Sequence, residues 1–162
     1  MLRSERLNQW LRDAHAMETQ AEQLLDGQAR RSERFPHLST RLREHLTTTR
    51  LQRTRLEGCI SRRQTTPSAI KDMAAKVTAT MQNLSGIFVE DEIVKGVLAV
   101  YTFEQMSVAS YEILEAAAIA DGDQETAIQC ALSRAEDEAL CTWLRENLRE
   151  VTIGYLSDRE AA

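Results

Sequence analysis

The sequence has few residues that would interrupt a helix. Its 162 residues include two prolines, six glycines, two Trp, three Tyr and three Phe. Proline and glycine are the residues that most often end or break helices, so their scarcity predicts long, uninterrupted helices. Ala, Leu, Glu, Arg and Gln, which lose little side-chain entropy in a helix, dominate the remainder. The composition therefore predicts an all-α protein.

Long apolar runs, an export signal and paired cysteines are also missing. No apolar run approaches the roughly 20 residues that span a bilayer, and the N-terminal residues MLRSERLNQWLRD lack the apolar core of a signal peptide. Cys59, Cys130 and Cys141 form no Cys-x-x-Cys pair of the kind that binds zinc. We therefore expect no membrane partner, reduced and packed thiols, and a cytoplasmic location.

The net charge of −5 hides an asymmetry between two parts of the chain. Residues 1–63 carry 13 Lys and Arg against 8 Asp and Glu, whereas residues 64–162 carry 7 against 17. A basic half can indicate nucleic-acid binding, but here no aromatic residues are interleaved for base stacking. We favour packing of the basic half beside the acidic half, within one chain or across a homodimer, over a nucleic-acid partner.

The spacing of apolar residues predicts five helices. Pro36 cannot continue the first helix, and Pro67 suits the first position of the third. The segment Asp121-Gly122-Asp123 separates the last two helices. The expected helices cover about residues 4–29, 37–63, 67–86, 91–120 and 124–155.

The connections between these helices predict a ferritin-like four-helix bundle with an additional, shorter crossover helix. Short loops make antiparallel hairpins of the first pair and of the last pair, and the third helix is the long connection between them. We expect a single domain over residues 1–162, with a core at about 4–155 and a frayed C-terminal tail at 156–162.

Three carboxylates interrupt the apolar lines that should face the core. Glu18 continues the line of positions 7, 11, 14, 21 and 25, and Glu104 that of 94, 97, 101, 108, 111 and 118. Asp137 continues the line of positions 141, 144, 148, 151 and 155. Buried carboxylates that converge repel one another, so they need a metal ion, a cationic partner or a shared proton.

The second helix offers one candidate ligand to this group. Its inward line contains His45 but no carboxylate, because Glu44 lies beside that line. A dinuclear site in a ferritin-like bundle uses about six protein ligands. As an alternative to a metal ion, Arg50 or Arg53 could reach inward and neutralise the acids.

Four segments resemble the YciE/YciF family of bacterial ferritin-like, stress-associated proteins over about residues 7–150. They are DAHAMETQ (13–20), REHLTTTRLQRTRLE (43–57), TFEQMSVASYEIL (102–114) and AEDEALCTWL (135–144). The resemblance implies the ferritin-like fold, dimerisation and a stress-related setting. Glu18, His45, Glu104 and Asp137 match polar positions of the family pattern.

Other positions depart from the family pattern. Two acids of its second helix are replaced by Thr47 and Thr48, a frequent histidine by Arg50, and later acids by Ser107 and Cys141. These changes weigh against a complete metal site.

The leading hypothesis is a non-catalytic, stress-associated homodimer that acts by interaction or scaffolding with an unidentified protein partner. In this hypothesis the carboxylate site is degenerate and no cofactor is bound. The alternative is a dinuclear iron or manganese protein that oxidises Fe(II) or scavenges peroxide. Its ligands would be Glu18, Glu104 and Asp137, with His45 assisting. Nucleic-acid association through the basic second helix is a third and weaker hypothesis.

Overall fold

The computed structural model describes residues 2–63 and 93–160. They form four helices: α1 (Arg3–Arg31), α2 (Pro36–Arg62), α4 (Ile93–Asp121) and α5 (Gln124–Glu160). These two stretches contain no strand, which confirms the all-α prediction. The predicted crossover helix at about 67–86 lies outside the described residues. None of the four helices combines the length and apolar character needed to cross a membrane.

The helix ends follow the local sequence. Pro36 is the first residue of α2, where its missing N–H costs no hydrogen bond. Gly122 ends α4 with a φ of 79°, a conformation that glycine adopts without strain. The Asp123 carboxylate then caps α5 by accepting a hydrogen bond from the Thr126 backbone N–H at 3.1 Å. α5 continues to Glu160, beyond its expected end at about residue 155.

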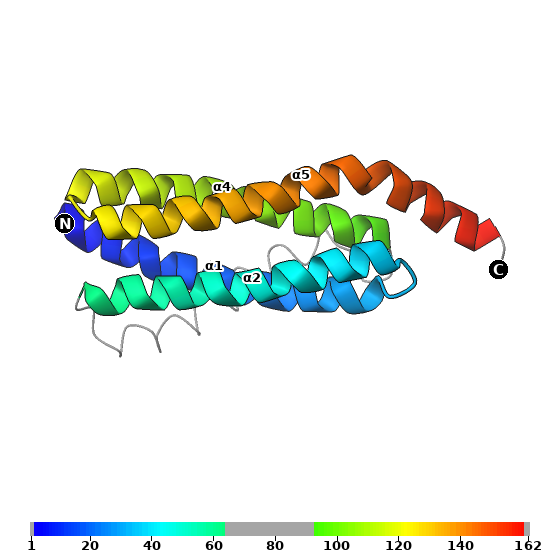
Figure 1. Cartoon of the computed structure of the whole chain (residues 1–162), viewed down its shortest axis with the longest axis horizontal. Coiled ribbons are helices and arrows are strands. Elements are labelled where there is room, and N and C mark those ends of the chain that lie inside the picture. The colour runs from blue at the N-terminus through cyan, green and yellow to red at the C-terminus, as the bar shows by residue number, and fades with distance from the viewer. Residues whose placement is uncertain (1, 64–92, 161–162) are drawn as a thin grey trace.

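The helices form two antiparallel hairpins, α1–α2 and α4–α5, that pack through α1 against α4 and through α2 against α5 (Figure 1). α2 ends and α4 begins at opposite ends of the bundle, as a topology with one long connection requires. α5 has 37 residues against 27 to 29 in the others, and its C-terminal part extends beyond them.

One arginine, at the end of α2, binds the start of α1 and the turn between α4 and α5. The Arg63 guanidinium, just after α2, lies 2.7 Å from carboxylate oxygens of both Asp121 and Asp123 in the α4–α5 turn. It also donates to the Ser4 hydroxyl at the start of α1, at 2.9 Å. Because its side chain is only 9% exposed, these charge-assisted hydrogen bonds are shielded from water.

A close approach between α1 and α4 depends on Gly96. The fully buried Gln28 side chain donates from Nε2 to the Ser32 hydroxyl at 3.2 Å and to the Ile93 carbonyl at 3.0 Å. A Cβ atom at position 96 would lie 1.9 Å from Gln28 Oε1. Glycine is therefore the residue that fits there.

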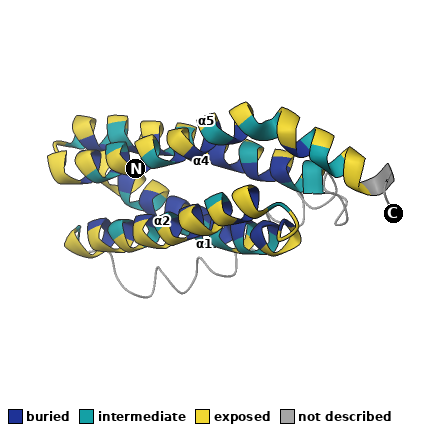
Figure 2. Cartoon of the chain, turned by 45° about the vertical axis from the view of Figure 1, so that its right-hand side comes forward, coloured by how far each residue is buried: buried dark blue, intermediate teal, exposed yellow. Residues whose placement is uncertain are grey.

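The buried faces of the helices meet inside the bundle (Figure 2) and form two apolar clusters. The first apolar cluster includes Leu7, Leu11, Leu56, Ile60, Leu114 and Ala118. The second apolar cluster includes Leu25, Leu38, Leu42, Val97, Leu140 and Leu144. Buried polar side chains from all four helices interrupt these apolar clusters. We call the following set the polar layer: Glu18, His45, Thr49, Gln52, Glu104, Ser107, Ser133 and Asp137.

Candidate functional site

The four residues predicted as a site all lie in the polar layer, one on each helix. Glu18 comes from α1, His45 from α2, Glu104 from α4 and Asp137 from α5. Each exposes only 1–2% of its surface. The helical spacing that placed these residues on apolar lines therefore also placed them inside the bundle.

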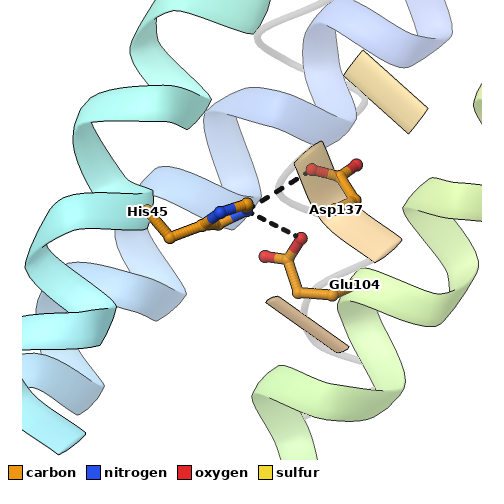
Figure 3. A group of neighbouring side chains, drawn as sticks. All are labelled: His45, Glu104 and Asp137. Atoms are coloured by element: carbon orange, nitrogen blue, oxygen red, sulfur yellow. Dashed lines mark hydrogen bonds and ion pairs between the residues drawn. The ribbon is translucent and has the colours of Figure 1, made fainter. Parts of the chain in front are cut away.

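His45 lies between two of the carboxylates (Figure 3). Its Nε2 atom is 3.3 Å from Glu104 Oε2 and 3.4 Å from Asp137 Oδ1. One ligand atom from each of the three side chains lies within 4.8 Å of the other two. The structure thus brings together three potential metal ligands from three helices.

Burial and charge act in opposite directions on these groups. Burial alone would lower the pKa of His45, but the hydrogen bonds and negative charges of Asp137 and Glu104 raise it to about 9. Burial raises the pKa of Asp137 to about 6, although the hydrogen bond from His45 opposes this change. In the absence of another cation, His45 therefore carries the positive charge of the polar layer at neutral pH.

Glu18 has a different partner from the other two acids. The Tyr111 hydroxyl donates to Glu18 Oε1 at 2.5 Å, and both side chains are buried. Burial and the charge of Asp137 raise the pKa of Glu18 well above its ordinary value, although the hydrogen bond from Tyr111 lowers it. The structure places Glu18 in the polar layer but outside the group formed by His45, Glu104 and Asp137.

The two arginines proposed to neutralise the core do not reach it. Arg50 Nε donates to Glu22 Oε1 at 2.7 Å, and the Arg50 side chain is 53% exposed. Arg53 also binds Glu22 and lies 3.8 Å from Glu57. The prediction of an inward arginine was wrong because Glu22, on the neighbouring α1, offers these side chains an acid near the surface.

Gln52 is the residue of the site that the sequence argument did not assign. Its Nε2 donates to Asp137 Oδ1 at 2.7 Å and to Glu136 Oε2 at 3.1 Å. Glu136 in turn accepts hydrogen bonds from both terminal nitrogens of Arg55, at 2.6 and 2.8 Å. The signal was present, since Gln52 follows His45 by two helical turns on the same inward line.

Four buried side-chain atoms of the described residues have no hydrogen-bond partner, and all four belong to the polar layer. They are Thr49 Oγ1, Gln52 Oε1, Glu104 Oε1 and Asp137 Oδ2. A buried oxygen without a partner costs roughly 1–3 kcal/mol. The buried oxygens that lack a hydrogen-bond donor or a cation therefore lie together in the polar layer.

The residues present do not fit the dinuclear site that ferritin-like bundles commonly hold. The hydroxyls of Thr47 and Thr48 bond to carbonyls of their own helix, and the Ser107 hydroxyl bonds to the Phe103 carbonyl. Glu44 is exposed. With Glu18 bound to Tyr111, three side chains present ligand atoms to one point, against about six in a dinuclear site.

Most arginines of the basic half pair with acids of the same chain. This arrangement favours charge neutralisation within the fold over a free basic surface for nucleic acid. The pairs are Arg30 with Asp26, Arg34 with Asp158, Arg43 with Glu33, Arg50 and Arg53 with Glu22, Arg55 with Glu136, and Arg62 and Arg63 with Asp123.

Comparison with known proteins gives a family model and similar solved structures. A family model described as a domain of unknown function (DUF892) matches residues 3–157. The crystal structure of a protein from Xanthomonas campestris pv. campestris is similar over 98% of both chains, with 28% sequence identity and a TM-score of 0.80. The likeness extends over the whole bundle, including all four helices that carry the polar layer.

Proposed function

We propose a function from the premise that the chain belongs to the DUF892 family, which lies in the ferritin-like superfamily. The protein is a non-catalytic helical bundle with an interaction or scaffold role, and its polar layer no longer supports dinuclear redox chemistry. The observation that carries this proposal is the shortage of ligands. His45, Glu104 and Asp137 can serve one ion, and the family positions that would serve a second hold no acid or histidine: they are Thr47, Thr48, Arg50, Ser107 and Cys141.

The second candidate function is a dinuclear iron or manganese protein that oxidises Fe(II) or scavenges peroxide. The unpartnered atoms of the polar layer favour it, because buried carboxylate oxygens without donors are suited to metal ions. It is the weaker candidate, since Glu18, its fourth ligand, is held by Tyr111.

Aerobic oxidation of Fe(II), followed by ferric absorbance, separates the two candidates. The wild-type protein should oxidise Fe(II) no faster than the Glu104→Gln variant, which keeps the shape of the side chain and removes its charge. A wild-type rate well above that of the variant, with two metal ions per chain, would refute the non-catalytic proposal.

The partner that the structure supports best is a second copy of this chain, bound through the outer face of α4. A helix that is apolar on all sides is normally buried on all sides. On α4 the side chains of Leu98, Met106, Ile113 and Ile119 are 44–57% exposed. Between Lys95 and Asp121, the single charged residue among the exposed positions of this helix is Glu112.

The outer face of α4 is complementary to itself in an antiparallel arrangement. With a two-fold axis at Ala109, Leu98 of one copy faces Ala120 of the other, and Thr102 faces Ala116. Large side chains then meet small ones, as interdigitating helices require, and one surface patch serves both subunits.

Light scattering coupled to size-exclusion chromatography tests this homodimer. Ala109→Glu places a charge on the two-fold axis and should give a monomer, whereas Ala139→Glu, at an exposed position of α5, should stay dimeric. A monomeric wild-type protein, or a dimeric Ala109→Glu variant, would exclude this interface.

The setting of the protein is proposed from two further features. The four segments that resemble YciE/YciF proteins support membership of that group and a stress-associated role. The three cysteines are free and buried, which fits a reducing compartment such as the cytoplasm. Measuring transcript levels under oxidative and osmotic stress tests the first proposal, and fractionation of cells tests the second.

A further inference from the structure

We propose that His45, Glu104 and Asp137 bind one divalent first-row transition-metal ion, which stabilises the bundle and does no redox chemistry. This inference rests on the non-catalytic function proposed above and names a ligand for the same polar layer. It differs from the dinuclear alternative in three ways: one ion binds instead of two, Glu18 is not a ligand, and the ion stabilises the fold instead of reacting.

The separations between the ligand atoms support a shared ion. His45 Nε2 lies 3.3 Å from Glu104 Oε2 and 3.4 Å from Asp137 Oδ1. Both distances are long for N–H···O hydrogen bonds, which cluster at about 2.9–3.0 Å. Two ligands at about 2.0–2.2 Å from one tetrahedral ion are separated by roughly 3.3–3.6 Å. The two separations from His45 therefore fit ligands around a common centre, and the third lies within 4.8 Å.

The charges of the group also match one divalent ion. Glu104 and Asp137 can carry two negative charges in a volume where each residue is 1% exposed. A divalent ion with a neutral imidazole and two carboxylates gives zero net charge, which a buried site requires.

A neutral oxygen next to the group, Thr49 Oγ1, can add to the coordination. Thr49 Oγ1 and Gln52 Oε1 are buried without hydrogen-bond partners, as are the second oxygens of Glu104 and Asp137. Thr49 and Gln52 follow His45 on the inward face of α2, one and two turns further along the helix. One imidazole with several oxygen donors suits Mn²⁺, Fe²⁺, Co²⁺ or Zn²⁺.

Gln52 has the role of a positioning residue in this site. Its Nε2 holds Asp137 Oδ1 at 2.7 Å and links it to Glu136, which is fixed by Arg55. Metal-binding carboxylates are commonly oriented by such hydrogen bonds, and loss of one typically weakens metal affinity by about 10–100-fold. Gln52→Leu should fall in that range and leave one ion per chain at saturation.

The direct experiment uses Co²⁺ as the probe. The full chain, first freed of metal with a chelator, is dialysed against Co²⁺ and measured by elemental analysis and visible absorbance. We expect one Co²⁺ per chain, visible bands from its nitrogen and oxygen ligands, and displacement of Co²⁺ by Zn²⁺. Saturating Zn²⁺ should also raise the melting temperature, because an ion that binds only the folded state stabilises it.

Two variants of unchanged shape separate loss of binding from loss of folding. Glu104→Gln and Asp137→Asn remove a negative charge and should lower Co²⁺ affinity by more than the roughly 100-fold expected of an outer-shell change. Their metal-free forms should melt at or above the wild-type temperature, because repulsion between the two acids is relieved. The control is Glu138→Gln, beside Asp137, whose side chain is 48% exposed.

The outcomes also distinguish this inference from the proposed function. Absence of bound Co²⁺, or equal binding by wild type and Glu104→Gln, overturns the metal site and leaves the non-catalytic function standing. If two ions bind per chain and both are lost in Glu104→Gln, the single-ion site and the non-catalytic function are both overturned. One ion per chain, lost in Glu104→Gln and Asp137→Asn and kept in Glu138→Gln, supports the single-ion site.

Discussion

Replacing Gly96 with alanine should destabilise the bundle, although alanine is the better helix former. The added Cβ would lie 1.9 Å from Oε1 and 2.6 Å from Cδ of Gln28, well inside any allowed contact. Gln28 has no exposed surface and is held by hydrogen bonds to Ser32 and Ile93. Its side chain must therefore leave this position, or α1 and α4 must separate.

The loss of stability can be calculated from the hydrogen bonds that the Gln28 side chain loses. Two hydrogen bonds donated by Nε2 and one that Oε1 accepts from Arg31 are lost, and with a buried partner left unsatisfied the cost is about 2–4 kcal/mol in total. Alanine recovers about 1 kcal/mol over glycine in a helix interior. We therefore expect Gly96→Ala to lower the free energy of unfolding by about 1–3 kcal/mol.

Equilibrium urea unfolding, followed by far-UV circular dichroism, measures this change. The matched control is Gly58→Ala in α2, where an added Cβ meets nothing within 4 Å, so stability should rise by up to about 1 kcal/mol. In a Gln28→Ala background the penalty at position 96 should disappear. An equal effect of the two glycine substitutions, or an unchanged penalty in that background, would refute the reasoning.

Three further predictions concern the polar layer and the α5 cap. The pKa of His45 is about 9 in the folded protein and about 6.5 when unfolded. Protonated His45 therefore stabilises the folded state fully below about pH 6.5, and this stabilisation is lost as the pH rises through about 9. Chelator-treated protein should thus lose on the order of 3 kcal/mol of unfolding free energy over that window; a profile as flat as that of His45→Gln contradicts this. Tyr111→Phe removes the donor to Glu18 and should cost about 1–3 kcal/mol in urea unfolding; no loss would mean that Glu18 finds another donor. Asp123→Ala removes the cap of α5 and also a carboxylate from Arg63, so it should cost at least the roughly 0.5–2 kcal/mol of a cap in the same assay, whereas Asp123→Asn should keep most of the cap.

Helix existence and the main inward faces could be predicted because they depend on local periodicity. On α2, every residue of the expected line is buried, from Leu38 through His45 to Leu56. On α4 the expected line was partly wrong, since Tyr101 and Val108 are only half-buried whereas Val100 and Ser107 are buried. α4 is apolar on nearly all sides, so its sequence does not identify the face that meets α1 and α5.

The partners within the polar layer could not be predicted, because they depend on how the helices are rotated against each other. Tyr111 shares a helix with Glu104 but binds Glu18 across the bundle. Arg50 and Arg53 have long side chains that reach whichever acid is nearest, and that acid, Glu22, lies on α1 at the surface. Spacing in the sequence identifies the inward positions but does not pair them.

The polar layer also determines how the helices are aligned along the bundle axis. Leucine and alanine pack almost equally well after one helix slides past another by one turn, about 5.4 Å. Such a slide would move Glu104 or Asp137 away from His45 and into an apolar cluster. A misaligned bundle is therefore less stable, because it buries a carboxylate without a partner. In the native alignment each acid meets its partner.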